Sequence, residues 1–278
     1  GVATLRPTSG LLPNATPAGQ PDPQGLWCDF VLARSVRDMT GVLAAVHGAS
    51  RSARPTIHPD RRLRAGLLMH DPLREMQVHP DCIVAVEQTG RALQALGYEV
   101  DAAYPPGFDT LFSRIGSDLG TVIAYARTAQ LDSLARIAGR SLTEGDVSTH
   151  HLQAAEQGRG ISAEEYDAAW MRIHSAVAPL RAWWRDGYDL LVTPTLRQPP
   201  WPLGLPDGPL HAGLFTFPAS LTGQPAVSLP LHWTEDGLPV GVQVIADVGE
   251  DEVLLAVAAQ LEAALPWRDR WPSLALSA

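Results

Sequence analysis

The chain has 278 residues, of which 45% are hydrophobic and 18% are charged, and its formal net charge is −9. This composition is typical of a globular protein with enough material for a sizeable apolar core. Acidic and basic residues are interspersed, so there is no basic stripe to bind a phosphate backbone, and we expect no nucleic-acid partner. No run approaches the roughly 18 apolar residues of a membrane span, so we expect no membrane association either.

All 21 basic residues are arginine, and the sequence contains no lysine at all. The two cysteines, Cys28 and Cys82, fit neither a disulfide framework nor a metal cage. With no segment that directs export, this cysteine content favours a reduced, cytoplasmic setting.

The N-terminal part of the chain is predicted to form a loop followed by a helix. Residues 7–30 are rich in proline, glycine, serine and asparagine, which predicts a surface loop. Residues 35–47 carry apolar side chains at helical spacing, with Ser35 as N-cap and Gly48 as the stop, so an amphipathic helix is predicted.

A crossover unit is predicted next. Residues 64–69 and 98–102 are short apolar runs of strand length, and residues 80–96 between them have helical periodicity. Two strands joined through a helix by short connections pair in parallel, and such a sheet needs helices packed against it.

The rest of the chain is predicted to be helical and then to return to the sheet. Residues 109–185 are almost wholly helical in pattern, with breaks at 139–140 and 158–160 and a capping box at 162–165. Residues 188–193 form a buried strand. Residues 226–231 and 239–245 flank an Asp-Gly turn that favours two antiparallel strands, and a helix over 250–265 closes the chain. The predicted fold class is therefore α/β, with a mixed β-sheet flanked by helices on both faces.

Local motifs give little sign of catalysis by this chain alone. There is no Gly-x-Ser-x-Gly elbow, no His-Glu-x-x-His zinc pair and no phosphate-binding Gly-x-x-x-x-Gly-Lys loop. Residues 158–163 match Gly-x-Gly-x-x-Ala, but a helix precedes them where a dinucleotide site needs a strand, so they mark a helix break. His150 and His151 point to different faces of a helix and are interpreted as solvated. We expect no cofactor and no metal.

Five segments in the same order resemble the amidase signature family of amide hydrolases. GVATLRPT at residues 1–8 resembles the stretch that follows the nucleophilic serine of that family. ARSVRD at 33–38, LAR at 134–136 and YDLLVTPT at 188–195 resemble further family segments. FTFPASLTGQPAVSLPL at 215–231, with DGLPVGVQVI at 236–245, resembles the family's C-terminal core. Arg6 stands where lysine is usual, which is a departure.

The resemblance implies that residues 1–278 are the C-terminal part of a single amidase domain. In that family a serine attacks the amide carbonyl, a second serine relays its proton, and a buried neutral lysine acts as the base. That Lys-Ser-Ser set would lie upstream of Gly1, so we expect no catalytic residue in this chain. Arginine cannot replace the lysine, because a guanidinium stays charged.

The resemblance also implies that this chain supplies a wall of the substrate pocket. The residues expected to line that wall are Gly213, Leu214, Phe217, Thr193 and Thr195. Each has a structural alternative: Phe217 would fill the core, Thr193 would end its strand, and Gly213 would serve backbone geometry. Gly213 leaves space and Phe217 offers an apolar surface, which suggests an uncharged or aromatic substrate group. Trp170, Trp183 and Trp184 are interpreted as core or interdomain packing rather than as a stacking platform.

Two functions remain open at this point. In the first, the chain is part of an amide hydrolase that acts on a small-molecule amide together with an N-terminal amidase segment or subunit. In the second, it is a non-catalytic binding or structural protein derived from an amidase. An unpaired sheet edge and exposed apolar surface are expected without the N-terminal segment, so homo-oligomers or aggregates are expected too.

Overall fold

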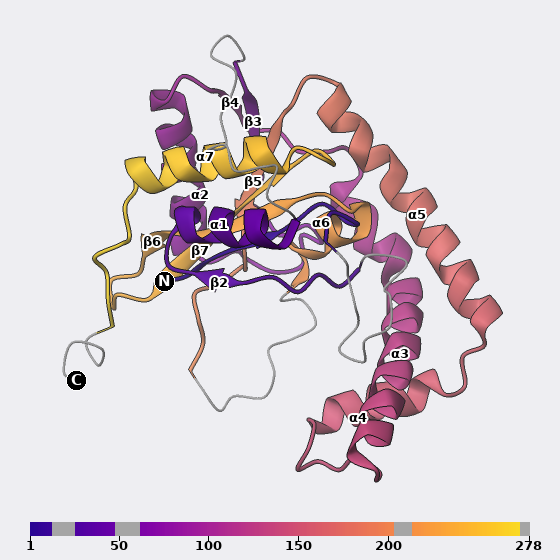
Figure 1. The fold of residues 1–278 in the computed structure, drawn as a ribbon. Coiled ribbons are helices and arrows are strands. Elements are labelled where there is room, and N and C mark those ends of the chain that lie inside the picture. The colour runs from indigo at the N-terminus through magenta and orange to yellow at the C-terminus, as the bar shows by residue number, and fades with distance from the viewer. Residues whose placement is uncertain (13–25, 48–61, 203–212, 273–278) are drawn as a thin grey trace.

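The computed structural model describes residues 1–12, 26–47, 62–202 and 213–272, and it contains one seven-stranded sheet with helices on both faces (Figure 1). The strands are β1 (Ala3–Arg6), β2 (Leu32–Ala33), β3 (Arg64–Leu67), β4 (Glu99–Asp101), β5 (Leu190–Pro194), β6 (Ala226–Trp233) and β7 (Pro239–Ala246). Their order across the sheet is β2-β1-β6-β7-β5-β3-β4. The pairs β3–β4 and β3–β5 are parallel and the other four pairs are antiparallel, which confirms the predicted mixed sheet.

The helices of the described ranges differ widely in length, and the two longest are α3 and α5. In chain order the helices are α1 (Val36–His47), α2 (Pro80–Ala95), α3 (Leu111–Ala138), α4 (Thr149–Gly158), α5 (Ala163–Arg185), α6 (Phe217–Thr222) and α7 (Asp251–Ala264), with a short 3₁₀ turn η2 (Phe108–Thr110) before α3. None of the helices in the described ranges combines the length and the apolar character that crossing a bilayer requires.

One face of the sheet is covered by α1, α2 and α7. On α2, Gly90 is so close to the sheet that a β-carbon there would lie 2.8 Å from Leu67 Cδ1 and 3.6 Å from Val100 Cγ1. The helix therefore packs directly on the β3–β4 crossover strands. The predicted strand–helix–strand unit is confirmed by the parallel register that pairs Ala65 with Val100.

The other face is covered in part, by the end of α5 and by α6. A β-carbon on Gly66, whose neighbour Leu67 faces α2, would lie 2.7 Å from the Trp183 ring. Trp170, Trp183 and Trp184 are all buried in the core, as the packing interpretation predicted. The buried core thus lies on both sides of the sheet rather than on one.

An arm built from α3, α4 and α5 extends beside the sheet, with α4 at its far end (Figure 1). The turn into α5 is the predicted capping box: Ser162 Oγ accepts a hydrogen bond from Glu165 N at 3.2 Å, and Glu165 Oε2 accepts one from Ser162 N at 2.8 Å. The break at Gly158 has a packing reason, because a β-carbon there would lie 2.1 Å from the carbonyl oxygen of Ala124. This glycine lets α4 approach α3 closely.

Several predicted boundaries differ from the structure. The helical pattern after residue 139 was too long: residues 140–148 form a turn in which Arg140 makes a bidentate ion pair with Asp146, and α4 begins only at Thr149. The strands β1 and β2 and the helix α6 were not predicted. The predicted stop at Gly48 and most of the predicted loop over 7–30 lie outside the described residues.

Candidate substrate-pocket wall

The polar residues near the predicted pocket share one face of the sheet. Side chains alternate between faces along a strand. Thr193 of β5 pairs with Gln243 of β7, and Gln243 pairs in turn with Ser228 of β6. All three therefore point to the face that α6 covers, away from α1, α2 and α7.

Gln243 joins β5 to the segment that leads into α6. Its side chain is 4% exposed, and its Nε2 donates hydrogen bonds to Thr193 Oγ1 at 3.0 Å and to the Phe215 carbonyl oxygen at 2.7 Å. The Thr193 hydroxyl itself donates to the Pro194 carbonyl oxygen at 2.8 Å. One buried amide thus fixes the distance between the two stretches that the sequence assigned to the pocket wall. No motif or spacing in the sequence distinguishes Gln243 from the other residues of its strand.

Thr195, which directly follows β5, forms a second polar contact with Ser228 of β6. Its Oγ1 lies 2.7 Å from Ser228 Oγ, and its backbone N–H donates to the Gly241 carbonyl oxygen at 3.0 Å. Thr195 is half-buried, whereas Thr193 is fully buried. In the described part of the chain, none of the side-chain hydrogen bonds of Thr195 or Ser228 reaches a histidine or a carboxylate.

The segment from Gly213 to Phe217 folds back on itself before α6. A β-carbon on Gly213 would lie 2.4 Å from the Phe217 ring, and Thr216 N donates to the Gly213 carbonyl oxygen at 3.0 Å. Leu214 is buried, while Phe217 is partly buried against the core. The structure therefore brings Gly213, Leu214 and Phe217 into one compact turn, and Gln243 ties this turn to Thr193.

Gly241 has no room for a side chain. A β-carbon there would lie 2.9 Å from Thr195 Oγ1 and 3.2 Å from Ser228 Oγ. We expect Gly241→Ala to push these hydroxyls apart and to lower the free energy of unfolding by about 1–3 kcal/mol, measured by chemical denaturation. The matched control is Gly116→Ala within α3, where nothing lies within 4 Å. That change should raise the free energy of unfolding by about 0.5–1 kcal/mol, because alanine favours a helix interior. Equal effects of the two changes would contradict the close contact.

The surroundings of the two cysteines disfavour the ionised thiolate that a nucleophile needs. Burial raises the pKa of the Cys82 thiol to about 12, and burial also raises the pKa of Cys28. A thiol with a raised pKa is not ionised near neutral pH and is a poor nucleophile. Among the described residues, no three His, Cys, Asp or Glu side chains come together as metal ligands would.

A cluster of charged and aromatic groups, also not foreseen, follows β3. His70 Nε2 lies 2.9 Å from Asp109 Oδ1, and Asp109 Oδ2 accepts hydrogen bonds from Tyr104 at 3.0 Å and from Arg74 at 3.1 Å. Burial would raise the pKa of Asp109, but the hydrogen bonds from His70, Tyr104 and Arg74 outweigh it and lower that pKa. Arg74 has a left-handed backbone with φ 55°, which is unusual for a residue with a side chain. These contacts fasten the loop after β3 to the segment before α3 that contains Tyr104 and η2.

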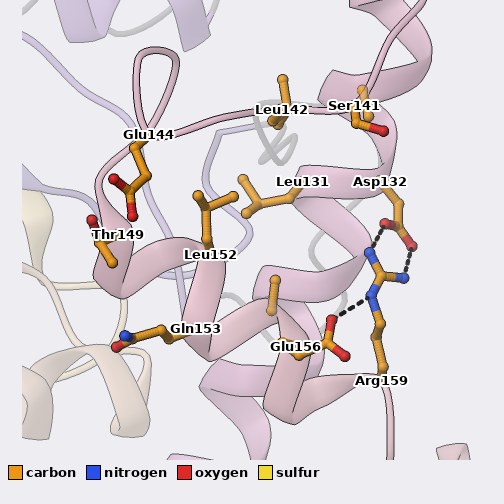
Figure 2. A pocket seen from close by; sticks show the side chains of 12 residues that line it. Leu131, Asp132, Ser141, Leu142, Glu144, Thr149, Leu152, Gln153, Glu156 and Arg159 are labelled. Atoms are coloured by element: carbon orange, nitrogen blue, oxygen red, sulfur yellow. Dashed lines mark hydrogen bonds and ion pairs between the residues drawn. The ribbon is translucent and has the colours of Figure 1, made fainter.

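A hollow of about 570 Å³ lies between α3, α4 and the turn that joins them. Leu131, Leu142 and Leu152 converge there, between Glu144 on one side and Arg159 on the other (Figure 2). Arg159 is already occupied by ion pairs with Asp132 at 2.8 Å and Glu156 at 3.3 Å. This hollow is on the arm and contains none of the five residues expected to line the substrate pocket.

The chain matches the family model described as Amidase over residues 1–255. It is 32% identical to the 6-aminohexanoate-cyclic-dimer hydrolase of Paenarthrobacter ureafaciens, over 99% of this chain and 61% of that protein. It is 25% identical to one subunit of the glutamyl-tRNA(Gln) amidotransferase of a Picosynechococcus species, over 99% of this chain and 62% of that protein.

The fold agrees with these matches. The solved structure of 6-aminohexanoate cyclic dimer hydrolase complexed with substrate superimposes with a TM-score of 0.83 at 31% identity, covering 99% of this chain and 62% of that one. The chain thus spans about three-fifths of the length of the relatives that it matches.

Proposed function

Because the chain belongs to the amidase signature family, we propose that it takes part in the hydrolysis of carbon–nitrogen bonds in amides, as the scaffold and one wall of the substrate pocket. The observation that carries this proposal is the match of nearly the whole chain, in fold and in sequence, to a hydrolase with substrate bound. The fold alone would not be sufficient, since one fold hosts many chemistries. Here the sequence identity of 31% adds weight to the fold.

The proton-transfer chemistry in this proposal comes from outside the 278 residues. A lysine can accept a proton near neutral pH only when its amine is desolvated, and this sequence has no lysine. The 21 arginines cannot take its place, because their guanidinium groups stay protonated. The Lys-Ser-Ser set is therefore supplied by an N-terminal amidase segment or by a separate polypeptide. The exposed Leu32 at the β2 edge, with 71% of its surface accessible, is consistent with a surface that such a segment or a second copy covers.

Within the pocket wall, each expected residue has a role that its surroundings support. The Phe217 ring and the Leu214 side chain would provide an apolar surface, and the absence of a side chain at Gly213 lets the Phe217 ring lie against its backbone. Thr195, half-buried beside Ser228, would offer a hydroxyl to the substrate, and the buried Thr193 would hold the wall through Gln243. No charged side chain is among these residues, so we propose an uncharged amide as substrate. The cyclic dimer for which two of the relatives are named is the first compound to test.

The alternative function is a non-catalytic binding or structural protein of amidase descent. The observation in its favour is the absence of lysine from these 278 residues, which leaves the chain by itself without the base of the family's reaction.

Co-expression with an N-terminal amidase segment that bears the Lys-Ser-Ser set tests the proposal. The purified complex is incubated with 6-aminohexanoate cyclic dimer, and new primary amine is measured; with simple carboxamides, released ammonia is measured instead. We expect turnover by the complex and none by the 278-residue chain alone. Replacement of the attacking serine by alanine in the added segment is the control and should abolish turnover.

Each outcome bears on one part of the proposal. If a stable complex forms but cleaves no amide, the non-catalytic alternative is favoured. If the purified chain cleaves amides without any added segment, the assignment of the base to another polypeptide is wrong.

A further inference from the structure

A second hollow, of about 520 Å³, lies where α2, the end of β6 and the end of α7 meet. Its polar lining comes from Gln88, His232, Trp233, Thr234 and Arg270, and its apolar lining includes Leu265. Among the described residues, neither aspartate nor glutamate lines this hollow, although the whole chain carries 30 of them. The hollow is therefore a locally basic site on an acidic protein.

An irregularity in β6 creates the polar side of this hollow. The pairing with β7 shifts between Pro230, which pairs with Gly241, and His232, which pairs with Val240. In a regular strand, His232 would share the face of Pro230, but the inserted residue turns it to the opposite face. His232 thus faces α2, where its Nδ1 lies 3.3 Å from Gln88 Oε1 and its Nε2 lies 3.4 Å from Asp81 Oδ1.

Arg270 is the group in this hollow most suited to bind an anion. Its guanidinium carbon lies 4.2 Å above the centre of the Trp233 ring. Stacking on an aromatic ring orients the planar guanidinium and leaves its N–H edges available for a bidentate acceptor. Within the described ranges, no carboxylate forms an ion pair with Arg270.

Two nearby negative groups do not cancel the positive charge of Arg270. Asp81 contacts His232, which lines the hollow, but Asp81 itself is not part of the lining. The C-terminal end of α7 borders the hollow at Leu265, and a helix end carries only about half a negative charge. The full positive charge of Arg270 exceeds that partial charge.

We propose that this hollow binds a small carboxylate that is attached to an apolar ring or chain. The carboxylate pairs with Arg270, and the apolar body lies against Leu265 and the exposed part of Trp233. The hollow lies at the end of β6 beside α2 and α7 and contains neither Thr195 nor Gln243, so this binding does not depend on the proposed hydrolysis.

Calorimetric titration of the 278-residue chain with benzoate and with benzamide tests the proposal, because the two probes have nearly the same shape and differ in charge. We expect benzoate to bind in the millimolar range and benzamide to bind at least about tenfold more weakly. Arg270→Gln should weaken benzoate binding at least about tenfold. Arg268→Gln, which removes a neighbouring charge that does not line the hollow, should leave it unchanged.

A second variant keeps the test decisive if loss of Arg270 disturbs folding. Trp233→Leu retains the guanidinium but removes its platform, so it should weaken both probes and keep the preference for benzoate. The proposal is wrong if benzoate fails to bind at about 10 mM, if benzamide binds equally well, or if Arg270→Gln has no effect. Binding of an acidic N-acetylated peptide without binding of benzoate would identify a protein-docking surface instead and would also overturn the proposal.

Discussion

Replacing Trp267 with alanine is expected to lower the free energy of unfolding by about 3–5 kcal/mol, the cost of removing a large aromatic side chain from a core. Trp267 is 0% exposed, and its indole Nε1 donates a hydrogen bond to the Arg34 carbonyl oxygen at 3.0 Å. The substitution therefore leaves a cavity and an unpaired acceptor together. In a protein of this size, thermal unfolding should shift downward by on the order of 10 °C, measured by calorimetry.

Trp271 provides the control for this prediction. It is 54% exposed, and its ring stacks against the Arg34 guanidinium at 4.0 Å. An exposed cation–π contact contributes about 0.5–1 kcal/mol, so Trp271→Ala should shift stability by no more than that. A similar loss from both substitutions would show that the C-terminal segment is fastened along its whole length rather than through Trp267.

Replacing Gln243 with methionine is expected to cost about 2–6 kcal/mol, because two buried acceptors lose their donor at about 1–3 kcal/mol each. Methionine has a similar length, so the change removes the hydrogen bonds to Thr193 Oγ1 and the Phe215 carbonyl oxygen with little change in volume. The loss should be seen as a lower denaturation midpoint. In the reconstituted complex proposed above, we also expect a higher KM, because the turn that carries Gly213 and Phe217 would no longer be held against β5.

A double-mutant cycle separates the two hydrogen bonds. Thr193→Val removes one acceptor, so the effect of Gln243→Met measured in that background should be smaller by about 1 kcal/mol. The exposed Gln153 on α4 serves as the control position, where Gln→Met should change stability by no more than about 0.5 kcal/mol. Strictly additive effects of the two changes would mean that the buried amide does not couple β5 to the pocket wall.

Local signals in the sequence predicted the elements whose stabilising contacts are local. The capping box at Ser162 and the Asp-Gly turn between β6 and β7 depend on residues a few positions apart, and the crossover around α2 joins two strands that are consecutive in the chain through one periodic helix. The structure has each of them.

The elements that were missed depend on distant partners. The segment β1 is a strand because its last three residues pair with Ala226–Ser228, more than two hundred positions away. The six-residue helix α6 is too short for a periodic pattern to be recognised. The turn after Gly139 is fixed by the ion pair between Arg140 and Asp146. The helical spacing of the apolar residues around this turn gives no sign of that ion pair.

The candidate pocket wall also depends both on segments that the sequence indicates locally and on a contact between distant residues. A resemblance in sequence pointed to Thr193, Thr195 and the segment from Gly213 to Phe217. Gln243, which connects these stretches, appeared only as one residue of a strand. Its role follows from an amide that crosses between two parts of the fold, and no spacing rule along the chain anticipates it.

The length of α3 has a consequence for how the molecule tolerates change. At a rise of about 1.5 Å per residue, its 28 residues extend about 42 Å, so α4 sits far from the sheet (Figure 1). Proteins open in separate cooperative units, and the least buried parts open first. We therefore expect the outer half of the arm to open before the sheet does, and we expect residues 140–148 to tolerate insertions, deletions and substitutions at little cost to the rest.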